Sequence, residues 1–200
     1  MYEVTQPMTK LEGINICLSS MGEPAINALD DAGVDAQMAA DLIDETSRGV
    51  QLKGWHWNRE THKLQPDQQG NLNLPMNTAK VDSTSVDIAV DVVQRGLRLF
   101  DRVNNTYTFT KPVTLELYVI LPYDELPQSA KNFIAYEAAC RFQRRLLGSD
   151  SIDKFLVEAR NEARVELIRD DIQVSDPNML KDNWTTASIM QRGAFRRGGY

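Results

Sequence analysis

Two histidines, His56 and His62, have side chains that could hold a metal ion. An even number of positions separates them, so both could face one side of an extended segment. Zinc sites in proteins take three or four nitrogen, sulfur or carboxylate ligands. The sequence offers no third histidine and no CxxC pair beside these two. We therefore expect neither a metal nor another cofactor.

Catalytic motifs are missing from the sequence, which contains no GxSxG, GxGxxG or GxxxxGK[ST] pattern. Glycan hydrolysis needs only two carboxylates about 5 to 9.5 Å apart. Asp124 and Glu125, beside Tyr123, are the best candidates for such a pair. These acids also stand where the start of a helix favours negative charge. We expect a protein that is not an enzyme, with a polysaccharide hydrolase as the alternative.

The composition predicts an ordinary globular chain. It has 200 residues, 42% of them hydrophobic, and a formal net charge of -6. That charge argues against a general nucleic-acid binder, although DNA could slide past an acidic wall. Arg141, Arg144 and Arg145 form a cluster that we interpret as a solvated or interface-facing surface. No apolar run approaches the roughly 20 residues of a membrane span, so we expect no membrane association.

Helical patterns occupy two stretches of the sequence, one on each side of its middle section. Thr9 and Glu12 fit a capping box at the start of a first helix, which Gly22 ends. A second helix is expected from about Val34 to Gly54. A third follows Pro127 and ends at Gly148, and a fourth continues to about Asp171. Cys17 and Cys140 lie in such patterns, and we predict two buried free thiols. Phe142 and Phe155 are predicted to lie on buried stripes.

The middle of the chain changes to the two-residue period of strands. Alternating apolar residues predict strands at 86–92 and 113–119. Segments 97–103 and 106–110 flank Asn104-Asn105 and predict a hairpin. Trp55 and Trp57 are expected on one side of an extended segment, as a wedge between sheet and helices, with a sugar- or base-stacking platform as the alternative.

These patterns predict an α+β fold: a four-helix bundle with an inserted small antiparallel β-sheet and an extended C-terminal tail. The expected domains are a helical bundle (1–54 and 121–171), an inserted β domain (55–120) and an extended docking arm (172–200). The arm has too few apolar residues for a core of its own, and a frayed end is the alternative. Its candidate partner-binding residues are Trp184, Arg192, Phe195, Arg196, Arg197 and Tyr200.

Three landmarks carry a resemblance to a known family. They are Leu18-Ser19-Ser20-Met21-Gly22-Glu23-Pro24, Gly54-Trp55-His56-Trp57-Asn58, and Tyr123-Asp124-Glu125-Leu126-Pro127 followed by Phe142-Gln143 and Gly148-Ser149. In order and spacing, over roughly residues 9 to 170, the chain resembles the tail tubular protein A family, the head-to-tail adaptors of short-tailed phages. None of the landmarks is a catalytic signature.

The resemblance implies a structural virion protein, made in the host cytoplasm, that forms a twelve-fold homo-oligomeric ring. Such a ring would join the portal protein to a tail nozzle protein resembling tail tubular protein B. Genomic DNA would pass through its channel without specific binding. The alternatives are the same tail protein with added polysaccharide-hydrolase activity, and a stand-alone carbohydrate- or nucleic-acid-binding module.

Overall fold

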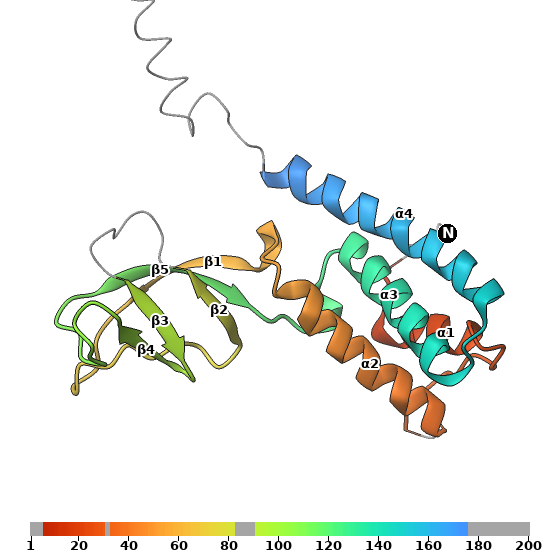
Figure 1. Ribbon diagram of the computed structural model, residues 1–200, viewed down its shortest axis with the longest axis horizontal. Helices are drawn as coiled ribbons and strands as arrows, with labels where there is room; N and C mark the ends of the chain where they lie inside the picture. The colour runs from red at the N-terminus through yellow and green to blue at the C-terminus, as the bar shows by residue number, and fades with distance from the viewer. Residues whose placement is uncertain (1–5, 31–32, 83–90, 176–200) are drawn as a thin grey trace, which may run out of the picture.

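A computed structural model describes residues 6–30, 33–82 and 91–175 (Figure 1). Within these ranges the chain is a mixed α+β protein with four α-helices and small antiparallel sheets. The helices are α1 (Lys10–Ser19), α2 (Val34–Gln51), α3 (Gln128–Leu146) and α4 (Asp150–Ser175). The strands are β1 (Arg59–Leu64), β2 (Thr78–Asp82), β3 (Val92–Arg95), β4 (Arg98–Asp101) and β5 (Val113–Val119), with short 3-10 helices η1 (His56–Asn58) and η2 (Tyr123–Glu125). None of the helices in these ranges is long and apolar enough to cross a lipid bilayer.

Local sequence signals set the helix ends. The Thr9 hydroxyl accepts the backbone N–H of Glu12, and the Glu12 carboxylate accepts that of Thr9, so the predicted capping box is confirmed. Gly54 follows α2 with φ of +74°, and a Cβ there would lie 2.7 Å from the Tyr118 ring. Only glycine fits this turn. Helix α4 continues to Ser175 rather than ending at Asp171.

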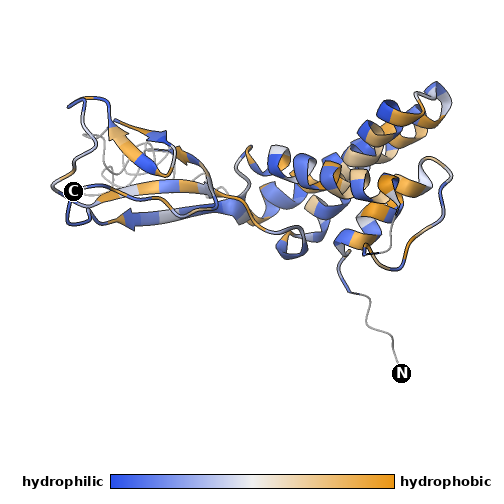
Figure 2. Ribbon diagram, turned by 90° about the horizontal axis from the view of Figure 1, so that it is seen from below, coloured by the Kyte–Doolittle hydropathy of each residue, from blue (hydrophilic) through white to orange (hydrophobic). Residues whose placement is uncertain are grey.

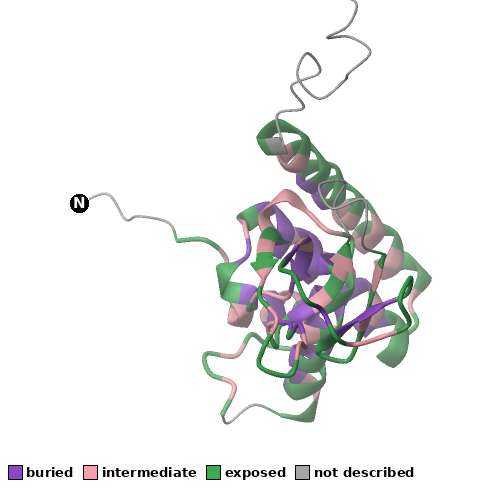
Figure 3. Cartoon of the chain, turned by 90° about the vertical axis from the view of Figure 1, so that its left-hand side faces the viewer, coloured by how far each residue is buried: buried purple, intermediate pink, exposed green. Residues whose placement is uncertain are grey.

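The helices share one apolar core, in which α3 lies between α2 and α4 (Figure 1). Small residues on α3, including Ala135 and Ala138, are fully buried and let the neighbouring helices approach. Phe142 is buried as predicted, whereas Phe155 is 74% exposed and is not part of this core. Seen end-on, the buried positions gather in the middle of the molecule (Figure 3).

The strands form two sheets rather than the single sheet expected. One has the order β1-β5-β2 and the other pairs β3 with β4, all antiparallel. Strand β5 confirms the predicted strand at 113–119, and its residues Val113, Leu115 and Leu117 are buried in a second apolar core. The strands and the helices lie at opposite ends of an elongated molecule, each with apolar residues along its elements (Figure 2).

The hairpin predicted for the middle of the chain is wrong in part. The partner of β4 is β3, joined through Gly96 with φ of +64°, and residues 106–110 form no strand of a sheet. A tight turn does occur at Asn105, where Asp101 and Thr106 exchange backbone hydrogen bonds. Of the strand predicted at 86–92, residues 86–90 lie outside the described residues.

The tryptophan segment is a 3-10 turn instead of a strand. Both indoles nevertheless pack against the helical core, and Trp55 Nε1 donates to the carbonyl of Val50 at 2.8 Å. This packing agrees with the predicted structural role of both tryptophans. The local fold differs because Asn58 bonds back to Trp55: its Oδ1 accepts the Trp55 N–H at 2.8 Å and closes the turn.

Two buried amides join the helical part to the strands. The Gln51 side chain donates to the carbonyl of Leu121 and accepts its N–H, at 3.0 and 2.8 Å. Asn58 Nδ2 donates to the carbonyls of Gln51 and Val119, at 2.8 and 3.0 Å. Both side chains are fully buried. The segment that leaves the helices and the segment that returns to them are therefore held together by hydrogen bonds with which water does not compete.

Cys17 and Cys140 are buried and free, as predicted. Burial raises the pKa of the Cys17 thiol to about 12, and raises that of Cys140. The thiols of the unfolded chain ionise at an ordinary pKa of about 8.5 to 9. The folded form therefore keeps protons on these thiols that the unfolded form loses. The contribution of the buried thiols to the free energy of unfolding is complete below about pH 8.5 and falls as pH rises toward 12.

We expect the midpoint of chemical denaturation to drop between about pH 8 and about pH 10.5 because the unfolded thiols ionise over this interval. A Cys17→Ala variant should lose less stability over the same interval, because one raised pKa is absent. Equal losses in the two proteins would show that Cys17 does not contribute to the alkaline sensitivity.

Candidate functional site

The two histidines do not form a common site. His56 Nδ1 lies 2.8 Å from a carboxylate oxygen of Asp171 on α4, and the same oxygen accepts the His56 backbone N–H. His62 Nε2 instead lies 2.7 Å from Glu60. In the described part of the chain, no group of three or more His, Cys, Asp or Glu side chains is placed to hold a metal ion. His56 and Asp171 thus join η1 to α4.

The acids beside Tyr123 have a structural place. One Asp124 carboxylate oxygen accepts the backbone N–H of Lys10 at the start of α1, 3.2 Å away. The Asp124 carbonyl accepts the ammonium of Lys131, and the Tyr123 hydroxyl donates to the Lys131 carbonyl. Glu125 is exposed. These contacts connect α1, η2 and α3. They give Asp124 a structural role that requires no catalytic function.

The arginine cluster at the end of α3 is exposed or half-exposed, but its members are paired. Arg144 makes two bonds to Asp153 at 2.7 and 2.9 Å, which raises the pKa of Arg144 and lowers that of Asp153. Arg145 lies 3.5 Å from Glu45 on α2. Most of this charge is therefore balanced within the helical part, across its surface.

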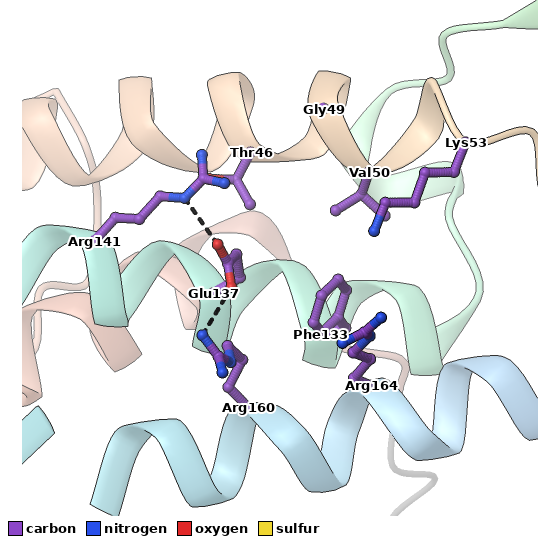
Figure 4. A pocket seen from close by; sticks show the side chains of 9 residues that line it. All are labelled: Thr46, Gly49, Val50, Lys53, Phe133, Glu137, Arg141, Arg160 and Arg164. Atoms are coloured by element: carbon purple, nitrogen blue, oxygen red, sulfur yellow. Dashed lines mark hydrogen bonds and ion pairs between the residues drawn. The ribbon is translucent and has the colours of Figure 1, made fainter. Parts of the chain in front are cut away.

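A groove between α2, α3 and α4 is a stronger candidate for contact with a partner. Its volume is about 300 Å³. It is lined by Thr46, Gly49, Val50, Lys53, Phe133, Glu137, Arg141, Arg160 and Arg164 (Figure 4). The α2 residues recur every three or four positions and so share one face of that helix. Four of the lining side chains are cationic and one is acidic.

Glu137 occupies one half of the groove and is matched there by two arginines. Arg141 Nε donates to its carboxylate at 2.9 Å, and a guanidinium nitrogen of Arg160 lies 3.6 Å away. Thr46 lines this half, and its buried hydroxyl has no hydrogen-bond partner among the described residues. Both arginines of this half therefore have a carboxylate partner in Glu137.

The other half carries positive charge without a matching acid. Lys53, in the turn that follows α2, and Arg164 from α4 extend toward the space beside Phe133 of α3 (Figure 4). Both cations are exposed, and neither has an ion pair with a described residue. Phe133 itself is buried. We define this half, formed by Lys53, Phe133 and Arg164, as the basic end of the groove; its chemistry suits a carboxylate or another anion.

Sequence reasoning missed this groove. Lys53 and Arg164 are far apart in the chain, and each looks alone like a solvated charge at the edge of a helix. Only the packing of α2 and α4 on opposite sides of α3 brings the two cations together. The spacing of three to four residues could have indicated that Lys53 lies on the same side of the chain as Thr46 and Val50. It could not have indicated which other helix packs opposite that side.

The sequence predicted six partner-binding residues beyond α4. Trp184, Arg192, Phe195, Arg196, Arg197 and Tyr200 all lie outside the described residues.

Comparisons with known proteins agree with one another. A family model described as "Tail tubular protein" matches residues 11–177, from α1 through α4. The chain is also similar to tail tubular protein A of Klebsiella phage KP34, at 25% identity over 144 residues. That alignment covers 72% of this chain and 76% of the phage protein.

Proposed function

Because the chain belongs to the tail tubular protein family of phage tail structural proteins, we propose that it is a head-to-tail adaptor of the virion. Twelve copies form a ring that joins the portal to a tail nozzle protein and lines the path of the DNA. The observation that carries this proposal is the family match over residues 11–177, which includes the helices and the strands together. The acidic net charge of -6 suits a channel wall that does not hold DNA.

A second part of the proposal concerns the docking arm (172–200), of which residues 176–200 follow α4. Trp184, Phe195 and Tyr200 supply large contact area, and Arg192, Arg196 and Arg197 supply bidentate bonds to carboxylates of a neighbour. Ordering such a segment costs conformational entropy, and only contacts with a partner can offset that cost. We therefore infer that the isolated chain is monomeric and that the portal triggers ring formation.

Electron microscopy of the purified chain with its portal tests the adaptor role. Rings are expected on portals, and light scattering of the chain alone is expected to report monomers at micromolar concentration. Bare portals at saturating protein would reject the adaptor. A stable closed ring in the absence of portal would reject the triggering step only. A chain ending at Ser175 should melt like the full chain yet leave portals bare; unchanged occupancy would assign the joint to the helices and strands alone.

A further inference from the structure

The basic end of the groove is unusual for an acidic chain. Lys53 and Arg164 face a common space, and neither has an ion pair with a carboxylate of the described residues, although the protein has more acidic than basic residues. Two cations held near each other repel, and an anion placed between them removes that repulsion. An arginine fork and a lysine ammonium both bond well to carboxylate oxygens. The missing partner is therefore an acidic group that the described residues of this copy do not supply.

Acidic groups of the required kind lie at the other end of α2. From Leu11 to Ser47 the sequence contains no lysine, arginine or histidine, and every charged residue is an acid. Within this stretch the loop between α1 and α2 presents Glu23 and Asp30. Both are exposed and without an ion pair among the described residues. We call residues 23–30 the acidic loop.

The acidic loop of one copy is remote from its own groove. Asp30 precedes α2 and Lys53 follows it, and α2 has 18 residues. At 1.5 Å per residue this helix is about 27 Å long. The acidic loop and the basic end therefore lie at opposite ends of the helical part, so they can meet only between two molecules.

We propose that the basic end of the groove binds the acidic loop of a neighbouring copy of this chain. Glu23 and Asp30 of one subunit bond to Lys53 and Arg164 of the next. The contact joins two different surfaces, and repeated head-to-tail contacts of this kind close into a ring when the rotation between subunits permits. This inference rests on the proposed ring and names the surfaces that build it.

A neighbouring copy fits the groove better than DNA does. Duplex DNA presents a phosphate every few ångströms and is bound by an extended basic face. The groove instead has its unpaired positive charge at one end, next to the half in which Glu137 pairs with two arginines, in a volume of about 300 Å³. A carboxylate-bearing loop can enter such a space, whereas the groove offers a phosphate backbone few successive contacts.

Charge exchange between two variants tests the contact. One variant is K53E/R164E, with an acidic groove, and the other is E23K/D30K, with a basic loop. In either variant alone, groove and loop carry the same sign, so we expect no rings on portals. In an equal mixture both kinds of contact join opposite charges, and alternating subunits should restore the rings. The matched control K63E/K111E changes two exposed lysines of the strand region that have no ion pair with a described residue; it should form rings like the unmodified chain.

The outcomes separate this inference from the adaptor role. Rings of K53E/R164E at unmodified occupancy would overturn the contact while leaving the adaptor intact, and bare portals with the unmodified chain would overturn the adaptor. Loss of rings in both variants without recovery in the mixture would also overturn the pairing, provided each variant melts like the unmodified chain. A duplex oligonucleotide that binds the unmodified chain but not K53E/R164E, with rings retained, would assign the groove to DNA.

Discussion

Replacing Phe142 with alanine is expected to destabilise the fold by about 3 to 5 kcal/mol, through lost apolar burial and the cavity left behind. The Phe142 ring is 1% exposed and lies in the shared helical core. For a chain of this size, each kcal/mol lowers the melting temperature by about 2 to 4 °C. Thermal unfolding followed by circular dichroism should therefore show a drop of about 6 to 20 °C.

Phe155 provides a matched control for this experiment, because it has the same side chain on the neighbouring helix and is 74% exposed. Phe155→Ala should change the free energy of unfolding by less than about 0.5 kcal/mol. Similar losses in the two variants would mean that the α4 surface contributes as much to stability as the core, contrary to the packing described above.

The second large effect is expected at the joint between helices and strands. Asn58→Leu keeps the approximate size of the side chain but removes its hydrogen bonds to Trp55, Gln51 and Val119. Each buried polar group left without a partner costs about 1 to 3 kcal/mol. We expect a total loss of about 3 kcal/mol or more, measured from denaturant unfolding.

Asn27→Leu is the control for the joint, since Asn27 is exposed and makes no hydrogen bond with a described residue. It should remain within about 0.5 kcal/mol of the unmodified chain. If Asn58→Leu were as stable as Asn27→Leu, the buried amides would not hold the two parts together.

Local signals predicted much of the fold. The capping box at Thr9 and the alternation at 113–119 are each encoded by neighbouring residues, and both occur as predicted. The turn at Trp55 was missed because it depends on Asn58, whose other partners Gln51 and Val119 include one distant in sequence. The pairing of β4 was assigned wrongly because two turns, at Gly96 and at Asn105, compete within a few residues.

The candidate groove depended on information that no local pattern contains. Lys53 and Arg164 come together only because three helices pack against one another, and apolar residues on other helix faces decide that packing. Sequence reasoning instead assigned interest to Arg141, Arg144 and Arg145, which are conspicuous as a cluster but are bonded to Glu137, Asp153 and Glu45. Arginines that cluster in the sequence were therefore not the ones that lack an ion-pair partner among the described residues.

The first and last strands of the chain's middle section pair with each other, with Arg59 opposite Tyr118. The chain therefore leaves the helices and returns to them at adjacent points, about one strand spacing or 4.8 Å apart. A segment attached in this way can change in length without moving α2 or α3. The helical part is thus a frame whose geometry does not depend on how long the chain between β1 and β5 is.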